Sequence, residues 1–389
     1  MLNKISVVIL SCILSLTMMI PTSSAIAQSA TPEDTYGDQY KPESVSVITQ
    51  TGQILYQSND DKVTDPASLT KMMTMYLTFD AIENGDIKAS DKIQITPDYE
   101  KMSELPNLAS VPLEAEQAYT IDQFLRQITL ESSNAATLIL GEKIVGSTSR
   151  FTNQMNDKAK KIGMEHTHFV NPTGADNQLL HQYAPEKYKK ERKTQTTSQD
   201  MTILMQHLLK DHPEVLTYSS KTKDNQFDTE LKTKNLSLKG ERFDLKGADG
   251  LKTGTSDEGY SLALTSKRDG LRLNEAILNV KPFPSNKAKN ERHKIANKHI
   301  NKQFDKYEYR KVLSEGEHEI NDKTYHVKND LYDVVPKKMK NVKLNVDKKG
   351  KAYVSYKRQF IKGTHAPKVD VSLKKEENKF TAFFKNLFR

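Results

Sequence analysis

Apolar and polar positions alternate near the start of the chain and then give way to a helical pattern. Residues 45–48 and 54–56 are short apolar segments on either side of Thr51-Gly52, which predicts a β-hairpin. From residue 66 to residue 82, apolar side chains occur on every side of a helical wheel. A helix that is apolar all round is a buried helix, and Asn84-Gly85 predicts its end.

The helical pattern continues through the middle of the chain. Thr120 and Gln123 have the spacing of a capping box, which predicts a helix that runs through Leu130. Two more helices are expected over residues 135–145 and 201–209.

Strand patterns return after residue 250. Residues 260–265 and 271–280 predict two strands joined by the hairpin turn Arg268-Asp269-Gly270. Residues 286–307 predict a polar helix with one apolar side. With strands near both ends of the region and helices between them, the pattern predicts an α/β (α+β) domain, an antiparallel sheet with a helical insertion.

Residues 309–373 contain short strand-like segments and turns, which predict a small all-β domain. The tail, residues 374–389, has apolar side chains at helical spacing with cations between them: Phe380, Phe383, Phe384, Leu387, Phe388, Lys379, Lys385 and Arg389. This pattern favours an amphipathic basic helix lying on an anionic membrane surface. The alternative is a helix that packs on the protein's own surface.

The first residues have the order of a signal peptide. Lys4 precedes an apolar run over residues 5–20, Pro21 ends the run, and Ala25-Ile26-Ala27 is a small-x-small cleavage site. We therefore expect residues 1–27 to be removed from an exported protein, the alternative being a retained anchor. We expect the protein on the outer face of the cytoplasmic membrane or in the cell wall, with peripheral attachment.

The charge and the cysteine content narrow the chemistry. The 389 residues carry a formal net charge of +8, and the single cysteine, Cys12, lies inside the predicted signal. Loss of the signal would exclude thiol catalysis. A basic exported protein meets anionic wall polymers and lipid head groups, and no nucleic-acid recognition motif is present.

Three short strings supply the groups for acyl transfer through a serine ester. They occur in the order Ser68-Leu69-Thr70-Lys71, Ser132-Ser133-Asn134 and Lys252-Thr253-Gly254. Each string alone has an ordinary structural explanation, as a helix start, a cap or a turn. Together and in this order they match the motif set of penicillin-binding proteins and serine β-lactamases.

Each of these residues has an expected role. Ser68 is the nucleophile, and Lys71, one helical turn away, is the base that takes its proton. Burial and a second cation, Lys252, would lower the pKa of Lys71 enough for it to act as a base. Lys252, with the hydroxyls of Thr253 and Thr255, would hold an anionic end of the substrate.

The remaining groups complete the site. Ser132 would relay the proton to the leaving amine, and Asn134 would hold Lys71 and the substrate amide. Gly254 would let a substrate backbone lie against the strand edge. The amides of Ser68 and Thr255 are candidates for the oxyanion hole. No metal site and no cofactor is expected, because no metal-binding motif occurs.

Four segments resemble low-molecular-mass penicillin-binding proteins, most closely the Gram-positive penicillin-binding protein 4 type. They are residues 66–73, 131–136, 249–254, and the segment Phe169-Val170-Asn171-Pro172-Thr173-Gly174, which is similar to one in D-alanyl-D-alanine carboxypeptidases. The resemblance covers residues 45–371. It implies a five-stranded antiparallel sheet flanked by helices (serine β-lactamase/transpeptidase-like) over residues 28–308, followed by the small β domain. That type ends in a membrane-spanning helix, whereas this chain ends in the basic tail.

The resemblance implies a serine-type D-Ala-D-Ala carboxypeptidase, with transpeptidase activity as a second outcome. Its substrates would be peptidoglycan stem peptides, and β-lactams would acylate Ser68. Two alternatives stay open, a secreted serine β-lactamase and a non-catalytic wall-binding protein. A class A β-lactamase needs a glutamate that positions water, and no Glu-x-x-x-Asn segment occurs between Ser132 and Lys252.

Overall fold

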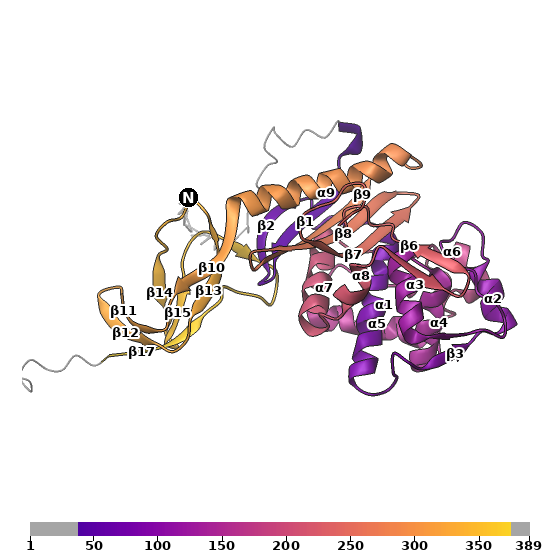
Figure 1. Ribbon diagram of the computed structural model, residues 1–389, viewed down its shortest axis with the longest axis horizontal. Helices are drawn as coiled ribbons and strands as arrows, with labels where there is room; N and C mark the ends of the chain where they lie inside the picture. Colours follow the sequence, from indigo (N-terminus) through magenta and orange to yellow (C-terminus); the bar gives the residue numbers. More distant parts are fainter. Residues whose placement is uncertain (1–37, 375–389) are drawn as a thin grey trace, which may run out of the picture.

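The structure is a computed structural model that describes residues 38–374 (Figure 1). The segments predicted to be a signal peptide and an amphipathic tail helix lie outside the described residues. Within them, no helix combines the length and the apolar character that a bilayer crossing requires.

The centre of the fold is a six-stranded antiparallel sheet in the order β16-β2-β1-β9-β8-β7. The predicted N-terminal hairpin is confirmed as β1 and β2, and the later hairpin as β8 and β9. The strands are β1 (Ser44–Thr49), β2 (Gln53–Ser58), β7 (Ala248–Ser256), β8 (Gly259–Arg268), β9 (Leu271–Val280) and β16 (Gln359–Phe360). Strand β7 lies at one edge of the sheet, where its outer backbone groups are available to a ligand.

Helices cover both faces of the sheet. Figure 1 shows α9 lying along one face, while the helical insertion gathers on the other. The α-helices are α1 (Lys71–Glu83), α2 (Pro97–Ser103), α3 (Ile121–Leu130), α4 (Asn134–Val145), α5 (Thr148–Ile162), α6 (Asn177–Leu180), α7 (Ser198–Asp211), α8 (Val215–Ser219) and α9 (Asn286–Lys306). Two short antiparallel strand pairs belong to the insertion: β3 (Lys92–Gln94) with β4 (Ala118–Thr120), and β5 (Lys223–Gln226) with β6 (Thr229–Lys232).

The helix predicted from residue 66 begins later than expected. Ala67–Thr70 form a turn of 3-10 helix, and the α-helix starts at Lys71. The reason is the backbone of Ala67, whose φ of +48° is incompatible with an α-helix. Helix α1 is buried over most of its length, as its all-round apolar pattern predicts. The capping box of Thr120 and Gln123 is also present at the start of α3.

A small all-β domain follows α9, as predicted. Its five-stranded sheet has the order β11-β12-β17-β15-β14, and β10 pairs with β13 beside it. The strands are β10 (Tyr307–Leu313), β11 (Gly316–Ile320), β12 (Lys323–Val327), β13 (Leu331–Pro336), β14 (Leu344–Val346), β15 (Lys351–Val354) and β17 (Val369–Leu373). A separate apolar cluster fills this domain.

One segment of the small domain returns to the main sheet. Strand β16 pairs with β2 and adds a sixth strand to the five expected, and the N–H of Ile361 donates to the carbonyl of Gly52 at 2.9 Å. The side chain of Ile361 is 1% exposed and belongs to the main apolar core. Gly52, with φ of +80°, leaves room for Thr364, whose side chain would lie 2.3 Å from a Cβ there. The two parts of the chain therefore share a sheet and a core.

Candidate active site

The 3-10 turn before α1 presents Ser68. The N–H of Ala67 donates to Oδ1 of Asp65 at 2.7 Å, which holds the left-handed conformation of Ala67. Strained backbone of this kind concentrates at functional sites. Burial raises the pKa of the Asp65 carboxyl to about 6.

Lys71 lies directly beneath Ser68 and is completely buried. Its Nζ contacts Oγ of Ser68 at 2.9 Å, Oδ1 of Asn134 at 2.8 Å and the carbonyl oxygen of Thr173 at 2.8 Å. Burial, with the positive charge of Lys252 nearby, lowers the pKa of Lys71 well below its usual value. An amine with a lowered pKa and a serine hydroxyl in hydrogen-bond range is the arrangement of a base and its nucleophile.

Ser132 lies in the loop between α3 and α4, and Asn134 is the first residue of α4. Ser132 has φ of +63°, and its Oγ accepts a hydrogen bond from Nζ of Lys252 at 2.9 Å rather than from Lys71. Asn134 uses its oxygen for Lys71 and its Nδ2 for the carbonyl of Ala109, at 2.7 Å. The loop therefore connects the two buried lysines.

Lys252 lies on the edge strand β7 and is 1% exposed. Its Nζ also donates to the carbonyl of Thr253, at 3.0 Å. Burial, together with the positive charges of Arg292 and Lys234, lowers the pKa of Lys252 to about 7. Its charge is thus sensitive to any anion that enters the site.

Gly254 makes a contact that the sequence did not predict. A Cβ at this position would lie 2.8 Å from the carbonyl oxygen of Pro66. The glycine therefore lets the turn that carries Ser68 pack against β7. The close approach of a substrate backbone to this glycine stays a prediction.

Arg292 is a site residue that the sequence did not reveal. It projects from α9, is 1% exposed, and donates from Nη1 to the carbonyls of Gly254 at 2.8 Å and Ser261 at 3.2 Å. No carboxylate within residues 38–374 pairs with it. Burial lowers its pKa to about 10. In the sequence it is one cation among many on a polar helix, so no local signal distinguishes it.

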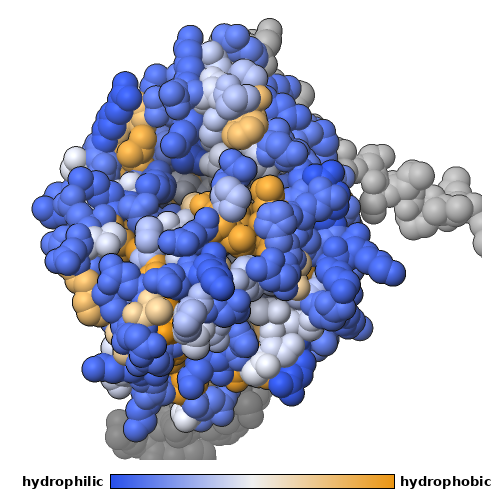
Figure 2. All heavy atoms as spheres, turned by 90° about the vertical axis from the view of Figure 1, so that its right-hand side faces the viewer, coloured by the Kyte–Doolittle hydropathy of each residue, from blue (hydrophilic) through white to orange (hydrophobic). Residues whose placement is uncertain are grey.

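These residues meet in one cleft of about 530 Å³. Six residues that line it matter for the chemistry: Ser68, Ser132, Asn134, Thr253, Thr255 and Arg292. Lys71 and Lys252 lie buried beneath this lining. Figure 2 looks at the end of the molecule that carries the helical insertion, where hydrophilic side chains cover most of the surface and apolar ones appear near the middle. Seven of the eight predicted site residues are thus brought together around the cleft or beneath it. The eighth, Gly254, lies on β7 between Thr253 and Thr255 and packs against Pro66.

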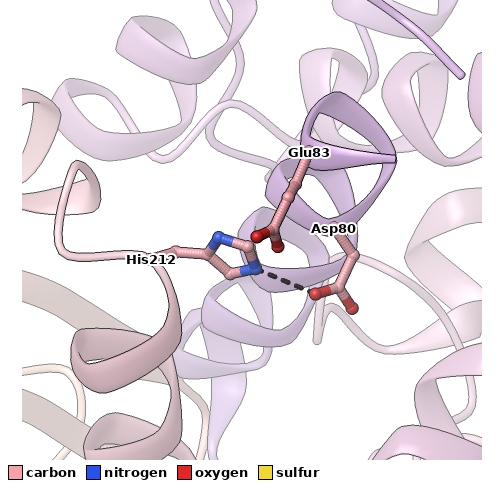
Figure 3. A group of neighbouring side chains, drawn as sticks. All are labelled: Asp80, Glu83 and His212. Atoms are coloured by element: carbon pink, nitrogen blue, oxygen red, sulfur yellow. Dashed lines mark hydrogen bonds and ion pairs between the residues drawn. The ribbon is translucent and has the colours of Figure 1, made fainter. Parts of the chain in front are cut away.

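Two clusters of ligand-type side chains lie within residues 38–374, and a lysine pairs with acids in each. Figure 3 shows His212 between Asp80 and Glu83, with its Nε2 2.8 Å from Oδ1 of Asp80. Lys158 already pairs with Asp80 at 2.8 Å, and Nδ1 of His212 lies 3.3 Å from Glu214. The cluster therefore ties α1 to the end of α7.

The second cluster is at the rim of the cleft and consists of Asp65, Asp257 and Glu258. The ammonium of Lys193 lies 2.5 Å from Asp257, 3.1 Å from Glu258 and 3.8 Å from Asp65. A lysine thus occupies the place where a cation would bind.

A nucleophilic serine above a buried lysine, beside a strand edge lined with cations, defines a serine–lysine acyl-transfer centre. Comparison with known families agrees with this class. The chain belongs to the D-alanyl-D-alanine carboxypeptidase family (Peptidase S11), whose model matches residues 32–282. Residues 309–372 match a second family, a domain of unknown function (DUF1958).

Curated relatives carry the same family name. The chain is 31% identical over 232 residues to D-alanyl-D-alanine carboxypeptidase DacF of Bacillus subtilis, a match that covers 59% of this chain and 54% of that protein. It is 28% identical over 245 residues to DacA of Escherichia coli K12, covering 62% and 56%. The match therefore spans about half the length of these relatives.

Solved structures show the same fold. A peptidoglycan synthesis regulatory factor (PBP3) from Streptococcus pneumoniae superimposes with a TM-score of 0.74 at 24% identity, covering 86% of this chain and 99% of that one. Penicillin-binding protein D2 from Listeria monocytogenes, in a cefotaxime-bound form, has a TM-score of 0.55 at 27% identity, covering 67% and 96%. The predicted fold class and the resemblance to low-molecular-mass penicillin-binding proteins are confirmed.

Proposed function

We propose that the protein is a serine-type D-Ala-D-Ala carboxypeptidase that acts on peptidoglycan stem peptides through an acyl-serine. The observation that carries this proposal is the 2.9 Å contact between Oγ of Ser68 and Nζ of a completely buried Lys71. The family name of the matching model and of the curated relatives supports the choice of substrate.

In the acylation step, neutral Lys71 takes the proton of Ser68 as Oγ attacks the carbonyl carbon of the penultimate D-Ala. The negative charge on the carbonyl oxygen is held by backbone donors, for which the amides of Ser68 and Thr255 are the candidates. The C–N bond then breaks. The leaving nitrogen receives the proton from Lys71 through the hydroxyl of Ser132, and D-Ala departs, leaving an ester on Ser68.

The ester has two fates. Water attacks it with Lys71 again as the base, which completes a carboxypeptidase cycle. The amine of a second stem peptide attacks it instead in a transpeptidase cycle, and a new peptide bond forms. How these two acceptors compete decides the balance between the activities.

β-Lactams enter the same first step, because Ser68 opens the ring and keeps it as an ester. The solved Listeria relative in a cefotaxime-bound form supports this proposal. Besides Ser68 and Asn134, the hydrogen-bond partner of Lys71 is a backbone carbonyl, that of Thr173. Between Ser132 and Lys252 the chain has no Glu-x-x-x-Asn segment of the kind that positions water in class A β-lactamases. The ester should therefore be released slowly, so that β-lactams inhibit the enzyme.

The experiment that tests this function combines a mass measurement with product analysis. Protein treated with benzylpenicillin should gain one adduct that maps to the tryptic fragment containing Ser68, and a diacyl-Lys-D-Ala-D-Ala peptide should release D-Ala. Rapid turnover of benzylpenicillin would favour the β-lactamase alternative. Folded protein with neither an adduct nor D-Ala release would leave the non-catalytic wall-binding alternative.

Arg292 provides a prediction about the substrate's carboxylate. Its charge has no acidic partner in the described part of the chain, and the carboxylate of the terminal D-Ala would supply one. Replacing Arg292 with Gln, which keeps a donor for the two carbonyls, should raise KM for the peptide about 10–100-fold, since a hydrogen bond to a charged group contributes about 1.5–3 kcal/mol.

Two comparisons decide this prediction in steady-state assays. A peptide with a C-terminal amide should react equally with wild type and Arg292→Gln, because it lacks the carboxylate. Lys289→Gln, which removes an exposed cation from the same helix and the same cleft, should have a much smaller effect. Equal losses for the acid and the amide substrates would contradict the assigned role.

We also propose that the protein works outside the cytoplasmic membrane, where its substrate lies, with residues 28–308 as the catalytic unit and 309–373 as the small domain. The family match over residues 309–372 supports this division. The basic tail would attach it to anionic lipid. In flotation with anionic vesicles, Phe383→Glu should reduce binding and added salt should weaken it. Equal flotation of intact and tail-deleted protein would remove this proposal.

A further inference from the structure

The segment that follows Phe169 contains a buried turn that the acylation mechanism above does not use. Oδ1 of Asn171 accepts three hydrogen bonds, from the N–H of Thr173 at 2.9 Å, the hydroxyl of Thr173 at 2.7 Å and the N–H of Gly174 at 2.8 Å. Its Nδ2 donates to the carbonyl of Ala175 and to Oδ1 of Asn177, both at 2.8 Å. Asn171 is fully buried, and both ends of its amide are bonded.

This turn fixes the position of the carbonyl group of Thr173. The carbonyl oxygen of Thr173 accepts from Nζ of Lys71 at 2.8 Å. Oδ1 of Asn134 is the second acceptor, and Oγ of Ser68 is the third neighbour. The two carbonyl-type oxygens can only accept, so each must take an N–H of Lys71. When the amine is neutral, its lone pair is then left pointing at Ser68.

The same turn also packs on the nucleophile. Gly174 has φ of +73°, and a Cβ there would lie 2.0 Å from the carbonyl of Ala67 and 2.5 Å from Oγ1 of Thr70. The turn therefore sits directly against the 3-10 helix that carries Ser68. Its geometry and the geometry of the base are linked by contact.

We propose that Asn171 is a positioning residue for acylation: by fixing the carbonyl of Thr173 on Lys71, it aims the lone pair of the base at the hydroxyl of Ser68. Asn134 aims the amine from one side and the Asn171 turn from the other. This inference rests on the proposed function, in which Lys71 is the base.

The test uses the pH dependence of acylation by a fluorescent penicillin in two variants. In Asn171→Ala the turn loosens and the carbonyl leaves the ammonium, so the protonated form of Lys71 loses a stabilising acceptor and its pKa falls. In a plot of acylation rate against pH, the acid limb is the rise in rate as Lys71 loses its proton, and it should move down by about one pH unit. The plateau rate should fall about 10–100-fold because the lone pair is no longer aimed at Ser68.

Asn171→Asp is the conservative comparison. Its second oxygen would face the carbonyl of Ala175 and Oδ1 of Asn177, so the buried carboxyl should stay protonated and donate where Nδ2 donates now. The other oxygen keeps its three donors, so the carbonyl of Thr173 should stay on Lys71 and the acid limb should remain at the wild-type position. Since either variant can be judged alone, one that does not fold leaves the other decisive.

A matched control separates positioning from general loosening of the segment. Thr74→Val removes the hydrogen bond from the hydroxyl of Thr74 to the carbonyl of Pro172, at 2.7 Å. Pro172 precedes Thr173 in the turn, but its carbonyl is not among the hydrogen-bond partners of Lys71. This substitution should lower the melting temperature without moving the acid limb. An unmoved limb in folded Asn171→Ala, or a shifted limb in folded Asn171→Asp, would overturn the inference. Wild type that forms no penicillin adduct would overturn the proposed function instead.

Discussion

Replacing Lys71 with Met is expected to lower the rate of acylation at Ser68 by a factor on the order of 10²–10⁴, the contribution typical of a positioned general base. Methionine fills the buried space of the lysine stem without a polar head. It also removes a buried cation whose neighbours are two neutral oxygens and a hydroxyl, so the fold should survive the change. The measurement is the second-order rate constant for labelling by a fluorescent penicillin, with Ser68→Ala as the zero reference.

The pH dependence of kcat/KM should reflect the charges of Lys71 and Lys252. The pKa of Lys71 is lowered by burial and by Lys252, so the base gains activity as pH rises through that lowered pKa. At higher pH, Lys252, with a pKa of about 7 in the free protein, loses the charge that would hold a substrate anion. Wild type should therefore show a bell-shaped profile of kcat/KM, and Lys71→Met should lose the acid limb.

Lys71→Arg separates the role of base from the role of charge. Arginine keeps the cation but does not lose its proton in this pH range. It should acylate as slowly as Lys71→Met. Acylation by Lys71→Arg near the wild-type rate would show that the position supplies a charge and that the base lies elsewhere.

The local patterns of the sequence predicted the fold well where neighbours in sequence decide the structure. The capping box of Thr120, the buried α1, the turn at Asp269-Gly270 and the apolar side of α9 all depend on residues within a few positions. The three motifs predicted a shared site for a related reason. Each is a short string whose chemistry can be read without knowing what it touches.

Features that depend on distant contacts were not visible. Arg292 enters the site because the carbonyls of Gly254 on β7 and Ser261 on β8, 38 and 31 residues away, lie beside it. Asn171 matters because its turn lies on Lys71, about a hundred positions earlier in the chain. The same limit hid the contact between Gly254 and the carbonyl of Pro66, which is distant in sequence. Strand β16 was missed because two residues carry too little pattern to predict pairing with β2.

The contact between the small β domain and the main sheet, made by Arg358, Asp333 and Gln53, leads to the second large prediction. Arg358 forms a two-pronged ion pair with Asp333, at 3.0 and 2.7 Å, and also donates to Gln53 of β2 at 3.2 Å. The side chains of Arg358 and Asp333 are 5% and 0% exposed. Arg358→Met would leave Asp333 charged and buried, and breaking a buried pair in this way costs about 3–5 kcal/mol of the free energy of unfolding.

The loss should affect the whole protein, because β16 and Ile361, only a few residues from Arg358, are part of the main sheet and core. Urea unfolding followed by far-UV circular dichroism should therefore show one transition, shifted to lower urea in Arg358→Met. The double variant Arg358→Met with Asp333→Leu should recover most of the loss, since a buried ion pair can often be exchanged for apolar side chains without a net cost. An exposed pair of the same domain, Lys374 with Glu317, serves as the control, and Lys374→Met should change stability by less than about 1 kcal/mol. A separate early transition for the small domain would mean that this contact does not couple the small domain to the main sheet. A loss of unfolding free energy no larger than that of the control would mean the same.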